Sequence, residues 1–138
     1  MKSSQGQVLA FFAVALPIVL LPVAAYAVDA ATVASRSAAL QAATAQAAET
    51  AAQQVNIGAI RSGGVVALDA TAVALVVAGT INEEEPGAFV ESSAVHGNVV
   101  VVVTSEPVTL PFSVFARAVT IHARATARLA LGYDSPGS

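Results

Sequence analysis

The side chains of this sequence that could perform chemistry are few, and their spacing does not build a site. His96 and His122 are 26 positions apart, one in an expected tight turn and one on an expected exposed strand face, which is not a spacing for metal ligands. Neighbouring carboxylates occur only in Glu83–Glu85, where we expect a solvated acidic loop. There is no G-x-S-x-G motif and no glycine-rich loop suited to phosphate. The sequence therefore predicts no enzymatic activity, cofactor, metal site or small-molecule substrate.

Composition and charge exclude further kinds of chemistry and of binding partner. The chain has 138 residues and no cysteine, which excludes disulfides, thiolate nucleophiles and cysteine-ligated metals but leaves export open. Six Lys and Arg without a basic cluster, and a net charge of −3, exclude nucleic acid as a partner. Hydrophobic residues make up 56% and charged residues 11%, unlike an ordinary soluble domain. The length suits one small domain plus an anchoring segment.

An uncharged apolar run, Val8–Val28, dominates the N-terminal part of the chain. Its 21 residues match the ~20 that a helix needs to cross a bilayer. Lys2 precedes the run and Asp29 is the first charge after it, so the positive-inside rule places the N-terminus in the cytoplasm. We expect a single-pass protein of the cytoplasmic (inner) membrane, or of the cell surface, with its C-terminal part outside. Pro17 and Pro22 are expected to kink or unwind the helix, although prolines are also common in spanning helices.

Three interpretations of this run stay open. It is a secretory signal cleaved after the small-x-small stretch Ala25–Ala27, or a plain anchor, or the spanning helix of a pilin-like subunit. The helical pattern continues past the proposed cut, which favours the two anchored interpretations.

An alanine-rich stretch without Gly or Pro, Val28–Val55, predicts that the helix continues. Small residues recur at every fourth position, and we expect this row to be a helix-packing face: Ala27, Ala31, Ser35, Ala39, Ala43, Ala47 and Ala51. A second such row lies beside it: Ala30, Ala34, Ala38 and Ala42. Small residues at this spacing let another backbone approach closely. About half of the row is expected to lie against the protein's own sheet. The remainder should meet another subunit, because ~25 residues of helix extend over ~37 Å.

The C-terminal half begins where glycines break the helix, at Asn56–Gly64. Asp69 as N-cap and Gly79 just past the end predict a short helix between them, with a strand as the alternative. Ile81–Gly87 is then expected to be an acidic loop.

Three strands are expected after that loop. A two-residue turn at His96-Gly97 predicts a hairpin in which Val95 faces Asn98 and Glu91 faces Val102. The run Val99–Val103 predicts a central strand covered on both sides, by the long helix and by either a neighbouring subunit or the short helix. After a proline-bounded crossover, strict alternation predicts a last strand with these outward residues: Thr120, His122, Arg124, Thr126 and Arg128. This basic face is either solvated or meets an acidic partner such as the Glu83–Glu85 loop of a neighbour.

The fold class expected is therefore α+β and membrane-anchored. A long N-terminal helix, made of the transmembrane part and its alanine-rich extension, is followed by a short helix and a small three-stranded antiparallel sheet. We divide the chain into a leader and transmembrane helix (1–28), the alanine-rich helix (29–56) and an exported α+β domain (57–138).

The sequence resembles the TadE/TadG-like proteins, pilin-like minor components of the tight-adherence (Flp-type) pilus machinery. The matching elements are Gly6-Gln7 after a short basic leader, Pro17, Ala27-Val28-Asp29, and Leu40-Gln41 followed by Ala43, Ala47 and Ala48. The C-terminal part, with a valine strand, a proline-bounded link and an A-x-A-x-A strand, is also similar. The resemblance implies a structural subunit or assembly factor whose partners are other pilin-like subunits and the membrane.

One position departs from the family pattern. Members cleaved by prepilin peptidase carry Glu five residues after the cleaved Gly, and here that position is Phe11. Processing between Gly6 and Gln7 is thus in doubt, and the resemblance favours the members that stay membrane-anchored. Cleavage between Ala27 and Val28 is the alternative, which would release a secreted β-rich binding domain. A membrane-anchored envelope protein with no pilus role is the other.

Overall fold

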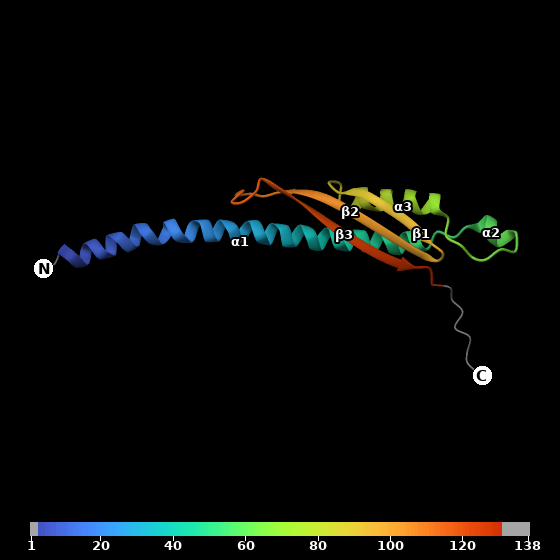
Figure 1. The fold of residues 1–138 in the computed structure, drawn as a ribbon, viewed down its shortest axis with the longest axis horizontal. Coiled ribbons are helices and arrows are strands. Elements are labelled where there is room, and N and C mark those ends of the chain that lie inside the picture. Colours follow the sequence, from blue (N-terminus) through green and yellow to red (C-terminus); the bar gives the residue numbers. More distant parts are fainter. Residues whose placement is uncertain (1–2, 131–138) are drawn as a thin grey trace, which may run out of the picture.

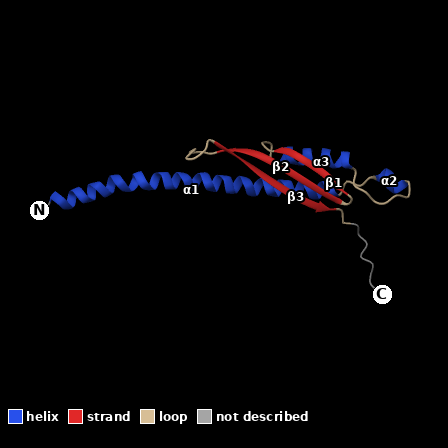
Figure 2. Ribbon diagram, viewed as in Figure 1, coloured by secondary structure: helices blue, strands red, loops and turns tan. Residues whose placement is uncertain are grey.

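The computed structural model describes residues 3–130, so Lys2, which sets the expected orientation of the span, lies outside the described residues. A helix of 50 residues, α1 (Ser3–Ala52), runs along the molecule, and a three-stranded antiparallel sheet lies across its C-terminal half (Figures 1 and 2). Two further helices, α2 (Ile57–Arg61) and α3 (Ala70–Glu84), connect α1 to the sheet. The expected α+β fold, with a long apolar helix followed by a short helix and a three-stranded sheet, is confirmed.

Helix α1 is continuous through both of its prolines. Pro17 and Pro22 lie inside an unbroken helix, so the expected local unwinding is wrong. Figure 1 shows only a gentle curve in this half of the helix. Each proline removes a single N–H donor, and the hydrogen bonds of the neighbouring turns carry the helix past it.

Helix α3 begins where the sequence predicts and ends later. The Asp69 carboxylate accepts hydrogen bonds from the N–H groups of Thr71 and Ala72, which confirms it as the N-cap. Gly79 does not end the helix, which continues to Glu84 and so includes part of the expected acidic loop. The reason lies in packing: the buried side of α3 repeats every four residues at Val73, Val77 and Ile81, and Ile81 comes after the glycine. The strand alternative for this segment is wrong.

The sheet consists of β1 (Phe89–His96), β2 (Val99–Thr109) and β3 (Ala118–Arg128), with β2 in the centre. The hairpin exists, but its expected register is wrong, because His96 pairs with Val99 and Val95 with Val100. Gly97 has φ 63° and is the first of the two turn residues, as a type II′ turn requires. Glu91 does not face Val102, because it is the extra residue of a bulge in β1.

Both α1 and α3 cover the same face of the sheet. The largest buried cluster joins Ala47 and Ala51 of α1, Val77 of α3, and Val100 and Val102 of β2. A second cluster lies nearer the N-terminal half of α1 and contains Leu40, Val108, Ile121 and Ala123. The core is therefore a layer of small side chains between one helix pair and one face of the sheet.

The opposite face of the sheet carries no other element of residues 3–130. Val99, Val101 and Val103 are half-buried there, and the expected alternation of β3 is confirmed, with His122, Arg124 and other polar residues exposed. The short helix is not the second cover of the central strand, because α3 packs on the same side as α1. A valine and arginine surface is left on the outer side.

Candidate helix-packing site

The row of small residues on α1 divides into a covered part and a bare part. Ala43, Ala47 and Ala51 are buried under the sheet, and Ala39 is half-buried at the boundary. Ala27, Ala31 and Ser35 are exposed, and so is the whole of the second row: Ala30, Ala34, Ala38 and Ala42. About half of the first row therefore lies against the protein's own sheet, and the rest has no partner within residues 3–130. We call the exposed members of both rows the bare face.

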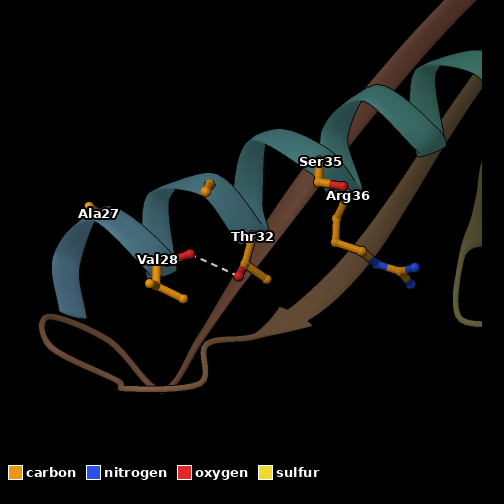
Figure 3. Close-up of a pocket in the computed structure, with 6 residues that line it drawn as sticks. Ala27, Val28, Thr32, Ser35 and Arg36 are labelled. Atoms are coloured by element: carbon orange, nitrogen blue, oxygen red, sulfur yellow. Dashed lines mark hydrogen bonds between the residues drawn. The ribbon is translucent and has the colours of Figure 1, made fainter. Parts of the chain in front are cut away.

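The bare face is smooth. Ala27, Ala31 and Ser35 line a shallow surface depression together with Val28, Thr32 and Arg36 (Figure 3). The Thr32 hydroxyl donates to the Val28 carbonyl oxygen at 2.9 Å, so this side chain is satisfied within its own helix. The side chains of Ala27, Ala31 and Ser35 are small, which allows another helix to approach this side of α1 closely.

The apolar part of α1 extends from the bare face toward the N-terminus and is exposed along its length. In residues 4–28, all side chains are exposed except Ala15 and Ala25, which are half-buried. Within the described residues, α1 is the one helix long and apolar enough to cross a membrane. The large side chains that it exposes include Leu9, Phe12 and Leu21. In water this surface is unfavourable, and its burial needs lipid or protein.

A buried carboxylate ties the sheet to α1 at the end of the apolar run. Asp29 is 4% exposed, and its two oxygens accept hydrogen bonds from the N–H groups of Phe112 (3.0 Å) and Val114 (3.2 Å). These N–H groups belong to the connection between β2 and β3. Bonds from backbone donors to a carboxylate are stronger than bonds between neutral groups, so the connection is held at a fixed position along the helix.

A second polar contact lies two turns further along α1. The half-exposed Arg36 guanidinium donates to Glu106, which is 2% exposed on β2, and lies 3.5 Å from Glu85. Glu106 Oε2 has no hydrogen-bond partner within the described part of the chain. Burying a carboxylate without a cation is costly, so the contact with Arg36 stabilises Glu106 in the core.

A third contact joins two hydroxyl groups in the core. The Thr44 hydroxyl lies 2.6 Å from the Leu40 carbonyl oxygen and 2.6 Å from the Thr104 hydroxyl. Because Thr44 has one hydrogen to give and its bond to Leu40 needs it, Thr104 must be the donor in the Thr pair. Together the three contacts place polar groups along the α1–sheet interface.

The predicted processing positions lie on the surface of α1. Gly6 and Gln7 are exposed in its first turns, and Phe11, which replaces the expected Glu, is 69% exposed. Ala27 and Val28 lie in the middle of the continuous helix, directly before Asp29. Cleavage there would cut α1 in two next to the residue that holds the β2–β3 connection.

The expected acidic loop and basic strand face do not contact each other within the chain. Glu84 accepts a hydrogen bond from Gln46, and Glu85 lies near Arg36. His122 lies 3.2 Å from Glu91 on the outer face of the sheet. In the part of the chain that the structure describes, no group of three or more His, Asp or Glu is placed to hold a metal ion.

Sequence reasoning did not identify the three polar contacts. A signal for two of them existed, because Thr104 and Glu106 lie on the same inward face of β2 as Val100, Val102 and Val108. A charge at an inward position of a buried strand indicates a partner on the covering element. The sequence does not show which cation on the helix would meet it.

Comparison with known proteins adds no relative. No protein-family model matches this chain, and no curated protein and no solved structure shows significant similarity to it. The class is therefore defined by the arrangement itself. A long N-terminal apolar helix packs through its C-terminal half on a small antiparallel sheet, which is a pilin-like topology.

Proposed function

We propose that this protein is a structural, pilin-like subunit or assembly factor of a tight-adherence (Flp-type) pilus, of the TadE/TadG-like kind. It is anchored in the cytoplasmic membrane by the apolar part of α1, with the sheet outside. It acts by packing α1 against other pilin-like subunits. The observation that carries this proposal is that α1 has a C-terminal half covered by the sheet, an uncovered apolar half, and the small residues of the bare face where the two halves meet.

The division supports assembly because the bare face continues a surface that already packs closely inside the protein. Ala43 and Ala47 bring α1 against the sheet, and the same spacing of small residues continues through Ala31 and Ala27, where nothing covers it. Small residues at this spacing let a second helix approach closely, and contact there buries apolar surface of both helices. A helix of another subunit with a similarly smooth side fits the bare face for this reason.

The uninterrupted helix also supports anchoring over release. The apolar region of a signal peptide has about 7–15 residues, whereas the uncharged apolar run Val8–Val28 has 21. Here the helix crosses the proposed cut after Ala27 without a break, and Asp29 joins the β2–β3 connection two residues beyond it. A protein released at Ala27 would lose the apolar half of the helix and keep the folded core.

The experiment is crosslinking from a photoreactive residue at Ser35 in membranes of producing cells. Ala31→Leu and Ala34→Leu each add a large side chain to the bare face. Ala43→Leu is unsuitable because Ala43 is 5% exposed in the protein's own core. We expect the adducts with pilin-like subunits to fall about fivefold or more, since overpacking costs ~1–3 kcal/mol.

The matched control is Ala78→Leu, the same change on an exposed position of α3. It should leave the adducts unchanged, and all variants should stay in the membrane fraction. Undiminished adducts in Ala31→Leu and Ala34→Leu would contradict packing through the bare face. The intact mass measured in the same membranes reports processing: a chain that starts at Gln7 indicates peptidase cleavage despite Phe11, and a chain starting at Val28 in the medium would contradict anchoring.

A further inference from the structure

The connection between β2 and β3 projects beyond the sheet along α1. Residues 110–117 form this connection, which the backbone bond from Leu110 N–H to the Arg117 carbonyl oxygen (3.0 Å) closes at its base. Figure 1 shows that it reaches further toward the N-terminal half of α1 than the rest of the sheet or α3. In Figure 3 it passes close to Val28. We call residues 111–116 the loop tip.

The position of the loop tip along α1 is fixed. Both oxygens of Asp29 hold backbone N–H groups of the tip, at Phe112 and Val114. The Phe115 ring meets the Tyr26 ring edge-on, with 5.5 Å between the ring centres and 85° between the planes. Phe112 shares a surface depression with Leu21, Ala24, Ala25 and Val28 of the apolar run. The loop tip therefore lies beside the last two turns of that run.

The loop tip is apolar and bare. Phe112 is 58% exposed and Phe115 is 83% exposed, next to the exposed Val114 and Pro111. No residue from 111 to 116 is charged, and Arg117 follows directly at the base. Two exposed phenylalanines on a loop held by a buried carboxylate are unfavourable in water, and they indicate an apolar environment around the tip.

The length of the apolar run gives the depth of the loop tip. Val8–Val28 rises ~31 Å as a helix, which equals the hydrocarbon thickness of ~30 Å, so the whole run is needed to span it. Asp29 then lies at the headgroups. Leu21 lies seven residues before Val28, or ~10 Å deeper along the helix axis. Since Phe112 shares a depression with Leu21 and Ala25, its ring lies at the depth of the outer-leaflet acyl chains.

We propose that the loop tip inserts into the outer leaflet of the membrane beside α1, as a second membrane contact of the protein. The inference rests on the proposed function only in that α1 spans the membrane. Tyr26 and Phe115 lie where aromatic side chains gather at membrane interfaces, and Arg117 lies on the headgroup side of the tip. The occupant of this surface is lipid because the tip is bare at the level where lipid surrounds α1.

The test uses the absence of tryptophan from the chain, which makes any introduced tryptophan a unique probe. Phe115→Trp is prepared in the full-length protein, reconstituted into phosphatidylcholine and phosphatidylglycerol vesicles that carry brominated acyl chains. Phe12→Trp, in the apolar run, and Val65→Trp, at an 85% exposed position beyond α2, are the matched controls. Phe112→Trp is a second probe of the tip if Phe115→Trp does not fold.

We expect brominated lipid to remove most of the emission of Phe115→Trp, with bromine near the headgroup more effective than bromine near the bilayer centre. Iodide in the aqueous phase should quench Val65→Trp strongly and Phe115→Trp weakly.

Quenching of Phe115→Trp by iodide alone overturns the proposal, while quenching of Phe12→Trp by lipid shows that α1 still spans. Protection of Phe115→Trp from both quenchers also overturns it, because a second protein copy then covers the tip. Protection of Phe12→Trp from lipid would overturn the span as well.

Discussion

Single polar residues fix how the sheet sits on α1. The interface consists mainly of Ala and Val, whose smooth surfaces define the longitudinal position of the two parts only weakly. Asp29 binds the β2–β3 connection, and Arg36 and Thr44 each bind a side chain of β2. A slide by one helical turn, ~5.4 Å, would separate all three from their partners and leave buried polar groups unpaired. These contacts therefore select one position out of several that the apolar residues alone would allow.

The threonine pair yields an asymmetric prediction. Thr44→Val removes the acceptor of the buried Thr104 hydroxyl and should lower the free energy of unfolding by ~1–3 kcal/mol. Thr104→Val should cost less, because the Thr44 hydroxyl keeps its bond to the Leu40 carbonyl oxygen. The double variant should be close to Thr104→Val, since no hydroxyl is then left without a partner. Denaturant unfolding in detergent measures all three, and equal costs for the two single variants would contradict the assigned donor.

At the scale of elements, the sequence predicts which helices and strands exist better than where they end. Local signals were sufficient for the N-cap at Asp69 and for the alternation of β3. The end of α3 was missed because Gly79 is a local stop signal, whereas the burial of Ile81 depends on contact with the sheet and α1. The hairpin register was missed because the positive φ of Gly97 and the bulge at Glu91 are set by pairing along the whole hairpin.

Two glycines in different elements should respond oppositely to alanine. Gly79 lies inside α3, and a Cβ there would meet nothing within 4 Å, so Gly79→Ala should raise the free energy of unfolding by ~0.5–1 kcal/mol. At Gly64, in the segment after α2, a Cβ would lie 3.0 Å from the Ala59 carbonyl oxygen, so Gly64→Ala should destabilise. Thermal unfolding of both variants checks the sign. A Gly79→Ala protein no more stable than the parent would contradict this prediction.

At the scale of the whole molecule, the architecture followed from the sequence, but the bare face did not follow in detail. The row of small residues predicted contact with the protein's own sheet and with another subunit. Only the structure shows that the covered and exposed parts of the row meet at Ala39. The division depends on where the sheet lies along α1, which the buried contacts of Asp29 and Glu106 determine. The identity of a charge can be read from a sequence, whereas its partner some 70 or more positions away cannot.

The fold outside the apolar run should be self-sufficient. No residue from 4 to 28 is buried, so a fragment of residues 28–138 keeps every described buried side chain. We expect it to unfold cooperatively in buffer without detergent, with a loss of ~0.5–1.5 kcal/mol from the missing contact of Tyr26 with Phe115. Circular dichroism during heating measures this. A gradual, non-cooperative change would show that the apolar half of α1 is needed for folding.

The continuity of α1 has a mechanical consequence. In the proposed anchored protein, residues 29–52 would rise ~36 Å from the membrane surface as part of the same continuous helix that crosses the bilayer. Spanning helices differ in tilt by tens of degrees, and a change of only ~10° would swing the far end of the helix by ~6 Å. Since the contacts of Asp29, Arg36 and Thr44 hold the sheet on α1, the sheet would move together with the helix as a lever arm. A neighbour that leans on the bare face would thereby turn the outer face of the sheet, with its valines and arginines, toward or away from the membrane.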